Sequence, residues 1–509
     1  MAPGGRAALP KYHTDMVTRQ LCGHTYRDPV FATSVVDTFV TDRLRAHGQP
    51  MGVDLVAVAR HAVRARRLFL LRDTLLALCS AAALVGAVGA ISALWARDVG
   101  QLGTCALIAV GGCLAGAVAV YIWGWVLWRA AQAVQWGTAP PREGADPVRE
   151  DLEKELDSLD ESNVVAYATA GQYVEHPFIG AGVYVMERVW AGIDVSKPAK
   201  DDQGVELTRK LFDEVDLHYY VAEHVGHLAG LDGLRARNRL HVMGQHAGDV
   251  PGLLPDDGRH RPATRIETAL VDAGISETQD VMRTYLVMER VGASGSYVVT
   301  VNVRARLAHD RLSWEIGAYY LPPVYAFLNN ADTRSFGPFE QAWRLLGFTR
   351  RELRSQLFGS LRRVLGLPSR LLVQELRRRR DLARIARGYF DYGTAGTLRA
   401  AATDFGRRRD FTQQMDAKDS YQRIQQGVLL ATEQFLKDHN VDVSDLKEAR
   451  TTINRQTYNF KGPISGQNIF GDYGVNFASG AGSHPGPAMD DGGGGSGEKQ
   501  AEDDDKGDT

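Results

Sequence analysis

Two long runs of apolar residues without a charge dominate the pattern of hydrophobic and polar positions along the chain. The first covers residues 74–96 and the second residues 102–128, with a polar gap of five residues between them. A helix needs about 20 apolar residues to cross the hydrocarbon layer of a membrane. Both runs are long enough, and the short gap requires the two helices to return antiparallel. The pattern therefore predicts a transmembrane helical hairpin over residues 74–128.

Arginines flank the hairpin where its two ends emerge. Five of them precede the first span: Arg60, Arg64, Arg66, Arg67 and Arg72. Arg129 follows the second span, whereas the gap carries only Arg97, beside Asp98. Because positively charged residues remain in the cytoplasm, we expect a multi-pass protein of the cell membrane with both termini cytoplasmic. The five arginines would bind lipids of the anionic inner leaflet, at about 1 kcal/mol each.

Few polar side chains interrupt the two spans. Apart from Thr74 at the edge, the hydroxyl residues are Ser80, Ser92 and Thr104, and no Asp, Glu, Lys, Arg or His is present. Transport and proton relay usually depend on such intramembrane groups. The hairpin is therefore interpreted as an anchor. A transporter or channel would require several hairpins to form a homo-oligomer, since two spans enclose no path.

The regions on either side of the hairpin differ in character. Residues 1–73 predict a cytoplasmic helical region, with two short helices split near Asp28 and Pro29 and a third that runs from about Val53 towards the first span. Residues 137–163 predict a linker, because glycine and prolines stop the second helix and a run of acidic residues follows. Such a run is typical of a solvated segment or a short helix.

An α+β domain is predicted over residues 164–450. The strongest strand signals are β-branched and aromatic segments at 281–290, 296–306 and 311–320, separated by turn residues at 292–295 and 309–310. Shorter strands are expected within 164–174 and 180–195, and helices at 205–228, 339–390 and 420–439. The fold class is therefore α+β: a two-helix transmembrane hairpin plus a cytoplasmic domain with a mainly antiparallel sheet and flanking helices.

Several fragments occur in a fixed order around the double span: DLVAVARHAVRARRLFLLRD, HPFIGAGVYVMERVWAGIDV, YLVMERVGASGSYVVTVNVRARL, SWEIGAYYLPP and FDYGTAGTLRAAA. In these motifs the chain resembles a group of uncharacterised actinobacterial integral membrane proteins, over about residues 11–455. The resemblance implies a membrane protein. It implies no activity and transfers no site residue.

The cysteine content excludes some kinds of site but indicates no activity. The four cysteines are Cys22, Cys79, Cys105 and Cys113, and three of them lie in the spans. No CxxC spacing occurs, so neither a disulfide framework nor a zinc knuckle is indicated, which fits a reducing cytoplasm. We expect no cofactor.

A group of histidines is the first candidate for chemistry. His218, His224 and His227 precede His241 and His246, and on a helix His224 and His227 would share one face, which suits a metal. The spacing is not HExxH and fixes no third ligand. The alternative is that these histidines are simply hydrogen-bonded or exposed.

Gly180-Ala181-Gly182 is the second candidate. A phosphate-binding loop needs a fuller glycine pattern that leads into a helix, whereas this one leads into a strand-like segment, VYVMERVW. A β-bulge or a close approach of two strands is the better interpretation.

A strongly basic helical region covers residues 344–387. It contains thirteen arginines and three acidic residues, which gives a net charge of +10. The densest run is Arg377, Arg378, Arg379 and Arg380. Leucines and a phenylalanine recur at helical spacing, and a break is expected at Leu367-Pro368. The region could lie on an anionic membrane surface, pack on the sheet with its arginines solvated, or bind nucleic acid. No base-reading motif accompanies it, so nucleic acid is the least favoured partner.

The C-terminal part changes composition twice. Residues 451–478 combine Asn, Gln and Gly with aromatic steps, and the core GPISGQNIFG weakly resembles C-terminal amyloid-forming motifs of some bacterial signalling proteins. The alternative is a tail that pairs with an edge strand of its own domain. Residues 479–509 are Gly-rich and then acidic, which predicts disorder.

Taken together, the sequence favours a membrane-tethered cytoplasmic binding or scaffolding module over an enzyme. One alternative is a metal-dependent enzyme centred on His218–His246, and another is a signalling protein that self-associates through residues 451–478. Neither a substrate nor a protein partner can be identified from the residues.

Overall fold

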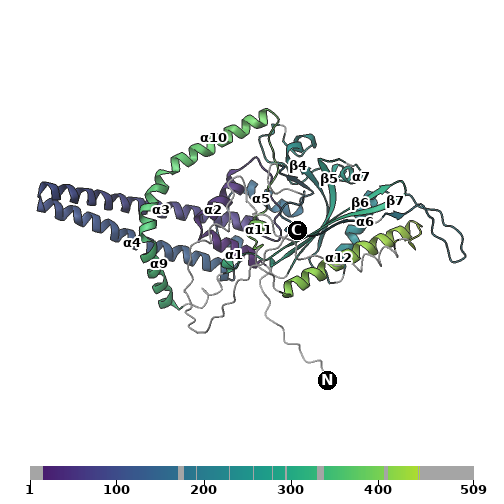
Figure 1. The fold of residues 1–509 in the computed structure, drawn as a ribbon, viewed down its shortest axis with the longest axis horizontal. Coiled ribbons are helices and arrows are strands. Elements are labelled where there is room, and N and C mark those ends of the chain that lie inside the picture. Colours follow the sequence, from purple (N-terminus) through teal and green to yellow (C-terminus); the bar gives the residue numbers. More distant parts are fainter. Residues whose placement is uncertain are drawn as a thin grey trace, which may run out of the picture.

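The computed structural model describes residues 15–169, 177–190, 192–228, 230–255, 257–277, 279–292, 295–329, 337–405, 411–444 and 446. A helical hairpin projects from one end, a cluster of short helices surrounds its base, and a sheet domain forms the other end (Figure 1). The predicted segments 451–478 and 479–509 lie outside the described residues.

The hairpin consists of α3 (Leu55–Ala96) and α4 (Val99–Trp136). The side chain of Asp54 caps α3 by accepting a hydrogen bond from the Ala57 amide, so the helix that precedes the first span is continuous with it, as predicted. Only Arg97 and Asp98 separate the two helices, so the predicted gap of five residues is too long. Arg97 adopts the left-handed conformation, and Asp98 caps α4 through the amides of Gly100 and Gln101.

Small residues bring the two hairpin helices into close contact. A Cβ atom added at Gly112 would lie 2.8 Å from the backbone nitrogen of Ala83, and one added at Gly86 would overlap the backbone of Ala109. Close approach of helix backbones through small residues is typical of membrane helices.

Short helices surround the base of the hairpin. They are α1 (Met16–Thr25), α2 (Pro29–Val36), a π-helical turn (Asp37–Thr41) and α5 (Glu150–Ser158). The two helices predicted on either side of Asp28-Pro29 are thus present. The acidic stretch predicted as a linker is not simply solvated, because α5 buries Leu152 and Leu156 in the same core as Val56 and Leu127.

The sheet has the strand order β1-β4-β5-β6-β7-β2, and β3 also pairs with β7. Only the β1–β4 pair is parallel among the described strands, so the predicted α+β class with a mainly antiparallel sheet is confirmed. The strands are β1 (Val164–Tyr167), β2 (Val183–Val189), β3 (Ile193–Asp194), β4 (Arg235–Met243), β5 (Met282–Val291), β6 (Val298–Ala308) and β7 (Arg311–Leu321).

The central strands β5, β6 and β7 form the meander expected from the sequence. His309 and Asp310 join β6 to β7 with φ angles of 49° and 59°, the left-handed pair that a two-residue type I′ hairpin requires. The predicted turn position is therefore correct to the residue.

Two helices cover one face of the sheet. They are α6 (Glu214–Gly226) and α12 (Phe411–Asp438), and both pack on a core that includes Leu286, Val301 and Trp314. The prediction that the first of these helices begins near Val205 is wrong, because Asp213 and Asp216 form a capping box that starts it at Glu214. The second begins nine residues before the predicted Ser420.

Helix α7 (Thr268–Ser276) packs on β4 and β5. The remaining helices are α8 (Ala326–Asn329), α9 (Pro338–Leu365), α10 (Leu367–Ala386) and α11 (Leu398–Ala401). The break between α9 and α10 falls at Gly366, directly before the predicted Leu367-Pro368. Short 3₁₀ turns lie at Pro141–Gly144, Leu159–Glu161 and Gly244–Asp249.

Candidate membrane-facing site

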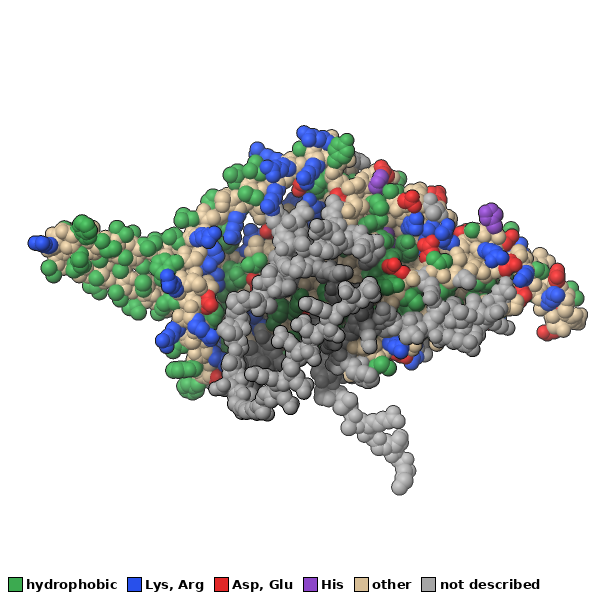
Figure 2. Space-filling view, viewed as in Figure 1, with side chains coloured by type: hydrophobic (Ala, Val, Ile, Leu, Met, Phe, Trp, Pro, Cys, Tyr) green, Lys and Arg blue, Asp and Glu red, His purple; other side chains and the backbone are tan. Residues whose placement is uncertain are grey.

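The exposure of apolar side chains changes abruptly along the hairpin. Near the start of α3, Val56, Ala57 and Val58 are buried. Further along, leucines and valines of both helices are open to their surroundings: Leu78, Val85, Val88, Leu107, Val110 and Leu114 are 57–76% exposed. Hydrophobic side chains predominate on the visible face of the projecting part of the hairpin, and a basic side chain lies at its tip (Figure 2). Both helices are long and apolar enough to cross a membrane.

Helix α9 runs across the hairpin at the inner edge of this apolar surface (Figure 1). The side chain of Leu357 packs on Gly116 so closely that a Cβ atom there would lie 2.5 Å from Leu357 Cδ1. Leu357 shares a buried cluster with Leu76 and Val120, and its carbonyl accepts a hydrogen bond from the Ser80 hydroxyl. The Ser80 hydroxyl group, one of the few in the spans, therefore helps to hold α9 against α3.

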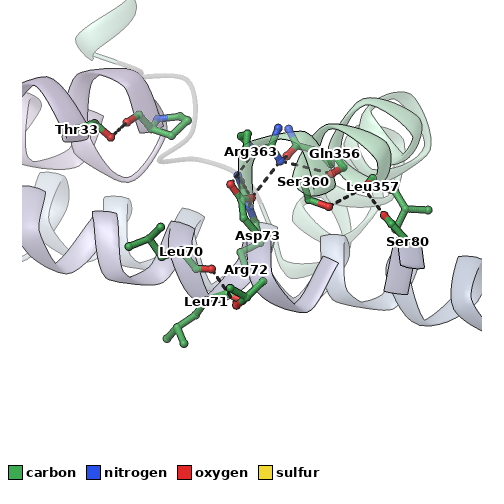
Figure 3. A network of polar contacts seen from close by, with 12 residues as sticks. Thr33, Leu70, Leu71, Arg72, Asp73, Ser80, Gln356, Leu357, Ser360 and Arg363 are labelled. Atoms are coloured by element: carbon green, nitrogen blue, oxygen red, sulfur yellow. Dashed lines mark hydrogen bonds and ion pairs between the residues drawn. The ribbon is translucent and has the colours of Figure 1, made fainter. Parts of the chain in front are cut away.

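A charged contact holds the same two elements together (Figure 3). Asp73 on α3 accepts hydrogen bonds from Arg363 of α9, with Nε at 2.7 Å and a terminal nitrogen at 3.1 Å. Arg72 approaches the same carboxylate at 2.8 Å. The Asp73 side chain is only 11% exposed, so removing either arginine would leave a poorly solvated charge with less compensation.

Nearer the start of α9, the face that carries Leu357 presents exposed aromatic and aliphatic residues. Phe339, Trp343 and Leu346 are 91%, 76% and 52% exposed. Their spacing of i, i+4 and i+7 places them on one face of the helix. This face continues the apolar surface of the hairpin around α9.

Helix α10 buries no residue. Leu372 and Leu376, at i and i+4, are 61% and 44% exposed and form an apolar strip. Helical geometry places Arg379 and Arg380 on either side of that strip. The predicted run from Arg377 to Arg380 is thus exposed throughout, and Arg379 also pairs with Glu375 at 3.1 Å.

Four of the five arginines predicted to lie on the membrane near the first span bind protein groups, and their contact with lipid stays a prediction. Arg60 forms a two-point ion pair with Glu153, and Arg64 donates to the Gly144 carbonyl. Arg66 approaches Asp37 at 3.5 Å, and Arg72 binds Asp73, whereas Arg67 is exposed. The sequence did not reveal this, because the partners are distant in the chain and α5 was interpreted as a solvated segment.

The histidine group is placed on α6 in two different environments. His218 is fully buried; its Nε2 accepts a hydrogen bond from the Ala305 amide, which fixes Nδ1–H as the donor to Asn238 Oδ1. Burial lowers the pKa of His218 to about 4. His224 is exposed and stacks on Tyr220, and His227 caps the end of α6. No group of three potential ligands for a metal occurs in the part of the chain that the structure describes.

Gly180 and Gly182 make the close strand approach expected of them. Both have positive φ angles, 76° and 105°. A Cβ atom on Gly182 would overlap the Tyr320 carbonyl of β7, and one on Gly180 would overlap the Thr397 side chain. Side chains and strand backbone therefore occupy the space that a phosphate would need.

A cavity of about 370 Å³, lined by both polar and apolar groups, lies between the π-helical turn and the loop at 390–396. Its acidic and basic groups bind their neighbours: Asp391 accepts hydrogen bonds from the amides of Thr169 and Gly393, and Arg45 pairs with Asp42 at 3.1 Å. Asp391 and Arg45 are therefore held by contacts within the protein, and these contacts account for their place in the cavity wall.

A family model described as the AbeC-like domain matches residues 189–474, more than half of the chain. The match contains the central strands, α9, α10 and α12, and it ends within the Asn- and Gly-rich segment predicted at 451–478. It does not include the hairpin, so the resemblance to actinobacterial membrane proteins stays an expectation. No curated protein and no solved structure matches the chain.

Proposed function

We propose that this chain, which belongs to the AbeC-like domain family, is an integral protein of the cell membrane whose α3–α4 hairpin tethers a cytoplasmic binding or scaffolding domain. The observation that carries the proposal is the change in exposure along α3 and α4. Each helix is packed in a protein core near its cytoplasmic end and presents bare leucine and valine side chains beyond it. Water would make such a surface costly, whereas lipid would cover it.

The polar groups of the hairpin support an anchoring role. Ser80 donates to Leu357, Ser92 to the carbonyl of Gly89, and Thr104 to the carbonyl of Gly100. These three serine and threonine hydroxyl groups thus each satisfy a backbone carbonyl. Groups used in this way are suited to packing rather than to moving an ion.

The proposed orientation rests on charge. The tip of the hairpin carries Arg97 and Asp98, whereas the base lies among the arginines of α3, α9 and α10. A basic cytoplasmic side then places the sheet domain and both chain ends in the cytoplasm. The binding role of that domain is favoured over metal catalysis because His218, the most buried of the three histidines, uses both ring nitrogens to hold β4 and β6.

Membrane integration is tested by introducing arginine into the exposed surface of the hairpin. We expect the wild-type chain to remain in membranes after carbonate extraction. A Val85→Arg/Leu107→Arg variant should become extractable, because each charge near the membrane centre costs about 2.5–3.5 kcal/mol. Val205→Arg/Leu211→Arg, at exposed positions of the sheet domain, is the matched control and should behave as wild type.

Complete extraction of the wild-type chain by carbonate would refute the tether. The choice between a binding module and a metal enzyme is tested by elemental analysis of the full chain purified in detergent. Stoichiometric zinc or iron, lost on His224→Gln/His227→Gln substitution, would refute the binding module.

A further inference from the structure

We infer that α9 and α10 form a collar that binds anionic phospholipid head groups: α9 lies in the plane of the cytoplasmic leaflet, and α10 leads from it through the head-group region towards the sheet domain (Figure 1). This inference rests on the proposed insertion of the hairpin and goes beyond it, because it assigns the lipid class and the residues that recognise it. The hairpin alone would cross any bilayer of suitable thickness.

The first argument is the depth at which α9 meets the hairpin. Sixteen residues separate Ser80, at the crossing, from Ala96 at the end of α3, which corresponds to about 24 Å at 1.5 Å per residue. From Val99 to Gly116 on α4 the length is about 26 Å by the same measure. The hydrocarbon layer is about 30 Å thick. The crossing therefore falls about 5 Å inside it, the depth at which amphipathic in-plane helices lie.

The second argument is the distribution of side chains on α9. One side packs on the hairpin through Leu357 and Arg363. Nearer the start of α9, the same face as Leu357 exposes Phe339, Trp343 and Leu346, residues that favour the boundary between acyl chains and head groups. Arg344, Arg351 and Arg362 share another side by helical spacing, where their guanidinium groups could reach phosphates.

The third argument is the exposure of the outer side of α10 in the part of the chain that the structure describes. The contacts of its inner side include Gln374 to Asp37 at 3.4 Å and Asp381 to Arg45 at 3.7 Å. On the same side, Ile385 packs on the cluster of Phe390 and Tyr392. Its outer side presents Leu372 and Leu376 between arginines. Six arginines and two acidic residues give α10 a net charge of +4.

A membrane surface explains both components of that outer side. Leucines can enter the acyl boundary while the arginine side chains extend to the head groups. Nucleic acid would satisfy the arginines but leave the leucine strip in water. Since α9 is clamped to the hairpin by Asp73 and Arg363, α10 is also held next to the leaflet that it would bind.

The test places a nitroxide on α10 of the full chain. Leu372→Cys is labelled in a variant whose four native cysteines are replaced by alanine, and the protein is reconstituted in vesicles of phosphatidylcholine alone or mixed with phosphatidylglycerol. Power-saturation EPR compares collisions of the label with oxygen and with a water-soluble nickel complex. In the mixed vesicles we expect oxygen to dominate. A label on Leu211→Cys, 91% exposed on the sheet domain, should remain accessible to nickel in both.

Charge specificity is tested with two matched double variants. Arg378→Gln/Arg380→Gln should lower the equilibrium constant for docking of α10 on the anionic vesicles about 30-fold, the effect of two arginines. Arg259→Gln/Arg311→Gln removes the same charge from exposed positions of the sheet domain and should have no effect.

The outcomes separate the collar from the tether. If the chain resists carbonate but the α10 label stays accessible to nickel in both vesicles, the collar is refuted and the tether stands. If oxygen dominates equally in both vesicles, anionic recognition is refuted. If added DNA, and not lipid, restricts the label, α10 is a nucleic-acid surface. A chain that carbonate removes refutes the tether and the collar together.

Discussion

The His218 side chain accepts a backbone hydrogen bond at a position of β6 where the neighbouring strand β5 supplies no acceptor. The pairing of β5 with β6 ends at Leu286 and Val303, whereas β6 stays paired with β7 as far as Ala308. Beyond Val303, the β6 amides on the β5 side therefore have no strand partner. The Nε2 atom of His218 accepts a hydrogen bond from the Ala305 amide, and Glu214 accepts one from the Leu307 amide. Helix α6 therefore caps the exposed end of the ladder, since buried amides without partners are costly.

This role predicts a specific pH dependence. Because burial lowers the pKa of His218 from 6.5 to about 4, the unfolded chain binds the proton more readily than the folded one between these values. The stabilisation is complete above pH 6.5 and is lost as the pH falls towards 4. Between about pH 7 and pH 5 the wild-type chain should lose about 2 kcal/mol of unfolding free energy from this residue.

The check is the urea midpoint of the detergent-purified full chain, followed by tryptophan fluorescence at both pH values. His218→Gln should be less stable at neutral pH and should lack this part of the acid sensitivity. His224→Gln, an exposed histidine on the same helix, is the control and should retain it. Equal acid sensitivity of the wild type and His218→Gln would contradict the capping role.

At the scale of elements, the sequence predicted best those features whose cause is local. The β6–β7 turn depends on His309 and Asp310 themselves, and the start of α6 depends on the Asp213 capping box. Asp213 and Asp216 stand three residues apart in the sequence, so this box is a local signal for a helix that starts at Glu214 rather than near Val205.

Contacts between residues that are far apart in the chain could not be predicted from local sequence patterns. Arg60 and Glu153 are 93 residues apart, and nothing in their local pattern indicates that they meet. The same holds for Asp73 and Arg363, separated by 290 residues. The basic character of α9 and α10 could be predicted, but the crossing of α9 over the hairpin at Gly116 could not.

The seam between α3 and α4 leads to a prediction for the hairpin as an element. Gly86→Leu should force the two helices apart, because the added side chain would meet the backbone of α4. Overpacking of this kind costs about 1–3 kcal/mol. The thermal unfolding midpoint in detergent should fall accordingly. Gly111→Leu, at a position with nothing within 4 Å of the added Cβ atom, is the control, and an equal effect of both substitutions would disprove the seam.

At the scale of the whole molecule, the parts form a continuous path from membrane to sheet. The hairpin base is surrounded by α1, α2 and α5 in one core, and α9 crosses the hairpin before α10 leads back towards the sheet domain (Figure 1). The domain is therefore connected to the anchor through two routes. Such a tether would hold the sheet domain in a defined position near the bilayer, whereas a flexible linker would let it move.

The central claim is that the hairpin crosses the membrane with its tip outside and the sheet domain inside. Single cysteines in a background without the native four test it directly: Val99→Cys, 80% exposed at the tip, and Leu211→Cys, on the domain. Intact cells are treated with a maleimide that cannot cross membranes. We expect labelling of Val99→Cys in intact cells, and of Leu211→Cys only after permeabilisation. Protection of Val99→Cys until the membrane is opened, or labelling of Leu211→Cys in intact cells, would contradict the account.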